Sequence, residues 1–341
     1  MLPSETVTVL FVRRKNRFSL LEGLCHNLDR FHTGKGGFCM LGLEYFTFEA
    51  KWSPIFLAFM LLVTAGYFLI TGPLSYRLKD SEPVSAGRKT LFVLGMLTMY
   101  MAQGGPIDLL GHTMFSFHMV SMAMSYLMAT PLLILGIPVW LWRYIDRKNP
   151  LKKLGFLARP VVAAVVFNGL FSFYHIPVIH DFVMLNFWVH RLYYILLFIT
   201  SIMMWWAIIQ PIPEKDKTSG LMKMGYIFLN MVLLTPACGL IIFSSEPMYA
   251  TYSDPNTWAK AMGYCVPGDP SKLLAQFGGP SFFGYLEPGI DQRVGGIIMK
   301  FFQEIIFASM LAYVFFHWYK RENKEDDPLP TDLQASNLNQ V

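Results

Sequence analysis

Five of the eight histidines of the chain are of a type and spacing that could bind a metal ion. They are His112, His118, His175, His180 and His190. Imidazole nitrogen binds copper, zinc and iron, whereas a thioether sulfur selects the softer Cu(I). Met119 directly follows His118, and Met122 lies four residues after it, on the same face of a regular helix. These residue types are chemically suited to binding copper as Cu(I).

Three carboxylates accompany the histidines: Asp108, Asp181 and Asp291. A carboxylate commonly orients a ligating histidine by accepting a hydrogen bond from its second ring nitrogen, and Asp181 directly follows His180. Each histidine taken alone is also compatible with a structural or interfacial hydrogen-bonding role. The number of histidines in this part of the chain favours a shared site.

The composition predicts that membrane helices position these residues. Of 341 residues, 54% are hydrophobic and 15% charged, whereas soluble domains carry about 25% charged residues. A membrane span needs about 20 mainly apolar residues. Seven segments qualify: residues 54–74, 90–104, 114–142, 157–174, 192–210, 221–243 and 295–316. The second is the shortest, and Pro131 and Pro138 are expected to kink or divide the third. The sequence therefore predicts an all-α, polytopic membrane protein with seven transmembrane helices.

The loop charges predict the orientation, because Lys and Arg concentrate in cytoplasmic loops. The loops after the first, third and fifth spans are basic, and the alternate loops are poor in Lys and Arg. This pattern places the N-terminus outside, the C-terminus inside and the five histidines near the outer face. The net charge of +5 is attributed to these loops, so the partner is the lipid bilayer and no nucleic acid is expected. The four cysteines lack paired spacing, which indicates neither a disulfide scaffold nor a zinc knuckle.

The ends of the chain differ from the membrane domain, which is expected at 40–320 with an external loop at 244–293. Residues 1–39 are basic and would lie outside, against the charge rule; either a short basic tail is translocated, or the natural chain starts at Met40. Residues 321–341 are expected to form a disordered cytoplasmic tail.

Within the last span, Lys300 and Glu304 are expected to form an ion pair inside the bundle. Trp205 and Trp206 are expected to anchor the fifth span at the inner surface.

Several motifs resemble the signature of the CtaG family. They are Asp108-Leu-Leu-Gly-His112, Met114-Phe-Ser-Phe-His118-Met119, residues 131–138, Tyr174-His175-Ile-Pro177 with His180-Asp181 and His190, Trp205-Trp206 before Pro211, and Asp291–Met299. The resemblance covers about residues 40–320. Many members carry a second histidine at the position of Met122, so this chain departs from a site made only of histidines.

The resemblance implies a seven-span assembly factor of caa3-type cytochrome c oxidase in the cell membrane of Bacillus-like bacteria. Its partners would be oxidase subunits, and it would not be an enzyme. The CuA centre of the oxidase faces outward, as the predicted cluster does. We therefore hypothesise transient Cu(I) binding at His118, Met119 and Met122, with help from His112, His175, His180 or His190, followed by transfer to the oxidase. The alternatives are a haem-binding electron-transfer protein, with His118 and His175 as ligands, and a copper transporter.

Overall fold

The computed structural model describes residues 42–78, 80–148, 159–264 and 269–325. The chain divides into two compact units, Met1–Tyr45 and Phe46–Val341. The described part of the first unit contains one short 3-10 helix, η1 (Leu43–Tyr45). The expected leader at 1–39 and the alternative start at Met40 lie outside the described residues. All candidate site residues belong to the second unit.

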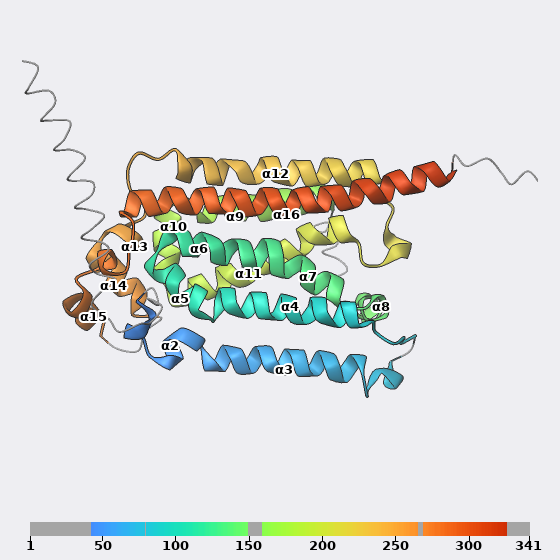
Figure 1. The fold of residues 1–341 in the computed structure, drawn as a ribbon, viewed down its shortest axis with the longest axis horizontal. Coiled ribbons are helices and arrows are strands. Elements are labelled where there is room, and N and C mark those ends of the chain that lie inside the picture. Colours follow the sequence, from blue (N-terminus) through green and yellow to red (C-terminus); the bar gives the residue numbers. More distant parts are fainter. Residues whose placement is uncertain (1–41, 79, 149–158, 265–268, 326–341) are drawn as a thin grey trace, which may run out of the picture. The chain divides into compact units, whose positions relative to one another are not determined.

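The described part of the second unit is helical and contains no strand, which confirms the all-α class. Figure 1 shows its long helices side by side. They are α3 (Pro54–Thr71), α4 (Ala86–Gln103), α9 (Pro160–Tyr174), α11 (Phe187–Ile209), α12 (Gly220–Ile242) and α16 (Pro288–Glu325). A further rod is continuous from α6 (Phe115–Met122) through the π-helix η3 (Ala123–Ala129) to α7 (Thr130–Gly136).

Shorter elements join the long helices. They are α2 (Phe48–Trp52), η2 (Ser75–Arg77), α5 (Pro106–Thr113), α8 (Val139–Lys148), α10 (Pro177–Met184), η5 (Pro213–Lys215), α13 (Ala250–Ser253), α14 (Pro255–Met262), α15 (Pro270–Phe277) and η6 (Pro280–Phe282). Many of them begin with proline, whose fixed φ suits the first helical position. The division expected at Pro138 is present, since α7 ends at Gly136 and α8 begins at Val139.

Five helical segments in the described residues are long and apolar enough to cross a membrane: 48–71, 115–136, 187–209, 220–242 and 288–320. The pair α9 and α10 also passes this test, although it bends by 80°, and makes a sixth if counted as one span. Helix α4 stands where the second span is expected and is not among them. The length and composition of these helices are those of a membrane protein. The number of seven spans and their orientation remain predictions.

Helix α16 packs between α6 and α12, and two glycines permit the close approach. A Cβ at Gly295 would lie 3.1 Å from Ser116 Cα on α6, and one at Gly296 would lie 2.8 Å from the Ile242 side chain on α12. Small residues serve this purpose in membrane proteins, where close packing of helices replaces the hydrophobic effect as the source of association. Helix α16 is therefore fixed against the helix that carries His118.

Two expectations about side chains need correction. Trp205 is fully buried, and its Nε1–H donates to the Tyr126 carbonyl (3.0 Å), so it is a core residue rather than an interfacial anchor. Lys300 and Glu304 do form an ion pair (2.6 Å), but 30% and 44% of their side chains are exposed, so the pair lies at the surface of the bundle. Lys300 also donates a hydrogen bond to the Thr235 hydroxyl (2.9 Å). Helix α16 continues to Glu325, so the first residues of the expected tail are helical.

Ion pairs join the basic connections at one end of the helices. Arg147 of α8 pairs with Asp80 (2.9 Å), Lys215 of η5 pairs with Asp146 (2.6 Å), and Arg143 of α8 pairs with Glu214. The connections after α3, α7 and α11, which the sequence assigns to the cytoplasmic side, therefore lie together. In Figure 1 the short helices α10, α13, α14 and α15 gather at the opposite end.

Candidate functional site

A sharp turn between α5 and α6 brings His112 and His118 to the same end of the helices. Met114 has an extended backbone (φ −136°, ψ 130°) and ends α5 before α6 begins. The two helices then pack closely at Gly111, where a Cβ would lie 3.2 Å from His118 Cα. Met114 is outside the helix, so it does not share a helical face with His118, whereas Met122 does.

Pro177 brings His175 and His180 together. A residue before proline is disfavoured in the helical conformation, and Ile176 is accordingly extended (φ −68°, ψ 126°). Helix α9 therefore ends at Tyr174, and α10 leaves at an angle of 80°. His175 lies at this bend, and His180 lies one turn into α10. His190 lies in the first turn of α11.

The five histidines form two neighbouring groups of rings. The His118 ring centroid lies 5.3 Å from that of His180 and 6.1 Å from that of His175, and the His112 and His190 centroids are 5.6 Å apart. Tyr174 joins the two groups: its ring lies 5.6 Å from His118, and its hydroxyl lies 3.3 Å from that of Tyr194, which packs on His190 (4.1 Å). The structure therefore brings all five predicted histidines together.

Several of these rings carry buried nitrogens that have no hydrogen-bond partner among the described residues. They are Nε2 of His118, His175, His180 and His190, and Nδ1 of His180. All four side chains are at least nine-tenths buried. Nearly all buried polar atoms in native proteins find a partner, and a group of exceptions calls for an explanation, such as a bound ion or water. The unsatisfied nitrogens mark this cluster as the candidate site.

The hydrogen bonds that do exist determine which ring nitrogens carry protons. His175 Nδ1 lies 2.7 Å from the Phe171 carbonyl oxygen, which can only accept, so Nδ1 holds the proton and Nε2 keeps a lone pair. His180 Nδ1 makes no hydrogen bond within the described residues, but it lies 3.6 Å from Asp181 Oδ1, and the negative charge of this carboxylate favours a proton on Nδ1. Ligating histidines are usually held in this way, with the second ring nitrogen facing a carbonyl or carboxylate.

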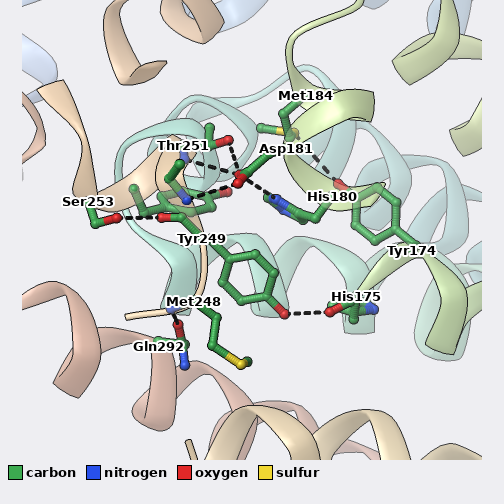
Figure 2. Close-up of polar contacts among 12 residues, drawn as sticks. Tyr174, His175, His180, Asp181, Met184, Met248, Tyr249, Thr251, Ser253 and Gln292 are labelled. Atoms are coloured by element: carbon green, nitrogen blue, oxygen red, sulfur yellow. Dashed lines mark hydrogen bonds and ion pairs between the residues drawn. The ribbon is translucent and has the colours of Figure 1, made fainter. Parts of the chain in front are cut away.

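The three carboxylates differ in what they contact. Asp181 accepts hydrogen bonds from the backbone N–H of Ala250 (3.0 Å) and from the N–H and hydroxyl of Thr251 (3.1 and 2.6 Å), as Figure 2 shows. Asp291 Oδ2 accepts from the Ser116 N–H (3.2 Å) at the N-terminus of α6. Both therefore attach other segments to the cluster, and Asp181 in addition faces His180.

Asp108 and His112 lie on α5, outside the membrane-spanning helices. Burial raises the pKa of Asp108 to about 6, although the positive charge of Arg191 opposes the shift. Burial lowers the pKa of His112 to about 4, and Arg191 and His180 contribute in the same direction. His112 is therefore neutral at pH 7 and able to offer a lone pair, as a metal ligand must.

The sulfur atoms lie around the cluster at different places. Met119 and Met122 are fully buried, and Met119 packs against α16, where its Cγ would lie 3.1 Å from a Cβ at Gly295. The sequence reasoning missed Met184, whose sulfur lies 3.6 Å from the Tyr174 hydroxyl in Figure 2. Its only sequence signal is its position four residues after His180 on α10.

Two tyrosines of the 244–293 loop cover the cluster, and the sequence reasoning missed them too. The Tyr249 hydroxyl donates to the His175 carbonyl (2.8 Å), and the Tyr252 hydroxyl donates to the Gly111 carbonyl (2.7 Å). The Tyr249 ring lies 4.6 Å from that of His180. In the sequence, the only feature that points to these two tyrosines is the aromatic content of the loop.

The arrangement has the dimensions of a site with few ligands. A metal–nitrogen bond is about 2 Å long, so two rings that share an ion have centroids roughly 5–6 Å apart, as His118 has from His180 and His175. In the described residues, no group of three His, Cys, Asp or Glu side chains is arranged to hold an ion. The rings would therefore have to move before three of these side chains could hold one ion.

Comparison with known proteins gives one family. The family profile described as cytochrome c oxidase caa3 assembly factor (Caa3_CtaG) matches residues 65–321. This range begins within α3, ends within α16 and contains all ten predicted site residues. No curated protein matches the chain. No solved structure matches it either.

Proposed function

This chain belongs to the cytochrome c oxidase caa3 assembly factor family, and from this membership we propose that it helps to deliver copper to the oxidase at the outer face of a bacterial plasma membrane. The oxidase subunits would be its direct partners. An assembly factor needs no bond-making chemistry of its own, so the protein is proposed to act without catalysis.

The group of buried imidazole nitrogens without hydrogen-bond partners carries this proposal. Leaving one buried polar atom unsatisfied costs about 1–3 kcal/mol, so five such nitrogens on four neighbouring side chains are costly unless they serve binding. Cu(I) fits the donors, since it accepts imidazole nitrogen and thioether sulfur. We propose that His118, His175 and His180 hold the ion, with Met122 or Met184 as a soft ligand and Asp181 orienting His180.

Few and soft ligands also suit transfer to another protein. An ion that is held by two or three side chains can exchange them one at a time with an acceptor, whereas a closed four-ligand site retains its metal. His112 and His190 form a second pair beside the first, and they would offer the ion a neighbouring position. The proposed orientation puts this end of the helices outside, where the CuA centre is assembled.

The experiment is the Cu(I) content of the purified protein beside that of His118→Ala. Both proteins carry Ser in place of Cys25, Cys39, Cys238 and Cys265, since thiolates also bind Cu(I). We expect about one Cu(I) per wild-type chain and strong loss in the variant. His317→Ala is the control, because this histidine is exposed on α16. Equal copper in wild type and His118→Ala would remove the metal site and leave the assembly role.

The assembly role and the orientation have their own tests. Cells lacking the protein should make the oxidase polypeptides and haem but show little oxidase activity; normal activity at every copper level would contradict this role. Reporter fusions after Lys89, Lys153 and Lys217 should be cytoplasmic, and one near Asp181 should be external. A cytoplasmic reading at Asp181 would contradict the proposed location of the cluster.

A copper transporter is the second candidate, and the bend at Pro177 is the observation that favours it. Transporters place binding sites where membrane helices are discontinuous, and the pair α9 and α10 is broken beside His175. Net copper uptake by membrane vesicles that contain only this protein would support this candidate. A haem protein is less favoured, because Phe115, Tyr174 and Tyr252 pack 5.6, 5.6 and 6.3 Å from the His118 ring, where a porphyrin would need space.

A further inference from the structure

An open cavity of about 270 Å³ lies beside the histidine cluster, between the turn that starts α6 and the segment that leads into α16. Three of its lining residues carry groups that bind cations: the sulfur of Met114 and the carboxylates of Glu287 and Asp291. The proposed copper ligands are not among its lining residues. It is therefore a separate space at the same end of the protein.

The side chains that line the cavity differ in exposure and in chemical character. Glu287 is exposed at the edge, whereas Asp291 is 7% and Met114 is 5% exposed. Two carboxylates in one cavity attract a cation from solution, and a thioether prefers Cu(I) to harder ions. This order suits an ion that is first attracted by charge and then selected by sulfur.

Tyr252 separates the cavity from the histidines. Its side chain lines the cavity, and its ring centroid lies 5.7 Å from that of His180 and 6.3 Å from that of His118. It is 5% exposed, and one hydrogen bond, from its hydroxyl to the Gly111 carbonyl (2.7 Å), fixes the end of the ring.

We propose that this cavity is the entry vestibule for Cu(I), and that Tyr252 is the gate between it and the histidine cluster. The inference rests on the proposed function. An ion would bind at the Met114 sulfur beside the Glu287 and Asp291 carboxylates, and it would pass to His118 and His180 when the Tyr252 ring turns aside. The backbone next to Tyr252 is held by Asp181 through Ala250 and Thr251, so the side chain moves and not the segment.

The experiment measures how fast the purified full chain, in lipid nanodiscs, takes Cu(I) from a chromophoric chelator, and how much it holds at equilibrium. The test variant combines Met114→Leu with Glu287→Gln and leaves Asp291 intact, because Asp291 also supports α6. We expect unchanged equilibrium content and loading slowed by about tenfold, because charged groups that line a cleft raise association rates by about 10–1,000-fold. The control combines Met262→Leu, buried in α14, with Glu246→Gln, exposed in the same loop, neither of which lines the cavity.

Tyr252 is tested separately, because its hydroxyl bond and its ring have different roles. Tyr252→Phe removes the bond to Gly111 and should speed both loading and release, whereas Tyr252→Trp should slow them. Wild-type loading rates in the double variant and in both Tyr252 variants would overturn the vestibule while the copper site stands. Equal equilibrium content in wild type and His118→Ala would instead overturn the proposed copper site on which this inference rests, and would leave the assembly role. A wild-type protein that takes up no Cu(I) overturns both.

Discussion

His175 Nδ1 lies 2.7 Å from the carbonyl oxygen of Phe171, one turn earlier on α9. This carbonyl is available because α9 ends at Tyr174, and the last carbonyls of a helix lack intrahelical partners. The bond assigns the proton to Nδ1 and leaves a lone pair on Nε2. The bend at Pro177 thus both ends the helix and fixes which nitrogen of the His175 ring is protonated.

The first prediction separates this hydrogen bond from the lone pair. In His175→Asn, the side-chain amide can still donate to the Phe171 carbonyl, but no donor atom remains in the place of Nε2. We expect near-normal accumulation in the membrane and an increase of at least about tenfold in the dissociation constant for Cu(I), since loss of an outer-shell partner alone typically costs about 10–100-fold and loss of a ligand should cost no less. His175→Phe removes both groups and should also lower the unfolding temperature. Wild-type Cu(I) affinity in His175→Asn would exclude His175 as a ligand.

The sequence predicts the histidine site better than it predicts its surroundings. His118, His175 and His190 can be placed at one end of the helices from loop charges and span boundaries, because each lies within a few residues of a helix end. Pro177 is also visible in the sequence, and its effect on the preceding residue is local. What brings the rings together is therefore largely encoded by nearby residues.

The contacts of the lid, which is the part of the 244–293 loop that covers the histidine cluster with Tyr249 and Tyr252, cannot be predicted in this way, and neither can those of the core. Tyr249 reaches the His175 carbonyl across 74 residues, and no local pattern indicates such a contact. A membrane helix is apolar on all sides, so periodicity does not show which face is buried. Trp205 was misplaced for this reason: its N–H donates to the Tyr126 carbonyl of η3, 79 residues earlier in the chain, and no local pattern indicates that contact.

The second prediction concerns the attachment of the lid. Asp181 accepts three hydrogen bonds from Ala250 and Thr251. Asp181→Ala leaves these donors without their partner, which should cost about 1–3 kcal/mol of stability. The stability of Asp181→Asn should lie between that of Asp181→Ala and that of wild type. Limited proteolysis should cut the 244–293 loop faster in the order wild type, Asn, Ala. The control is Asp254→Ala, which removes a cap within the same loop but no contact to α10. Equal cleavage of Asp181→Ala and wild type would show that the lid is held elsewhere.

The third prediction concerns the contact between α16 and α6. In Gly295→Ala the new methyl group would lie 2.9 Å from the Phe115 ring and 3.1 Å from Ser116 Cα, so the two helices must separate. Overpacking of this kind typically costs about 1–3 kcal/mol, and it would displace the start of α6, which carries His118.

The matched control for this substitution is Gly239→Ala on α12, where a Cβ would meet nothing within 4 Å. It should be neutral or slightly stabilising, because alanine is the better helix former by about 1 kcal/mol. Thermal unfolding in detergent, followed by circular dichroism, measures both variants. An unfolding temperature for Gly295→Ala equal to that of Gly239→Ala would argue against this close contact.

The fourth prediction is a pH dependence that arises from Asp108. Burial raises the pKa of this carboxyl from 3.8 to about 6 in the folded protein, so the folded state binds its proton more tightly than the unfolded state does. The stability that Asp108 contributes is therefore complete below pH 3.8 and is lost as the pH rises through 6. Asn resembles the protonated acid and does not titrate. Asp108→Asn should accordingly unfold at a higher temperature than wild type at pH 7.5, and the difference should disappear towards pH 4.

The comparison between wild type and Asp108→Asn also removes the contribution of His112. The lowered pKa of His112, about 4 in the folded state, reduces stability as the pH falls below 6.5, and it does so in both proteins. Only the difference between their unfolding temperatures reports on Asp108. A difference that is the same at pH 4.5 and pH 7.5 would show that Asp108 titrates normally and that α5 leaves it in contact with water.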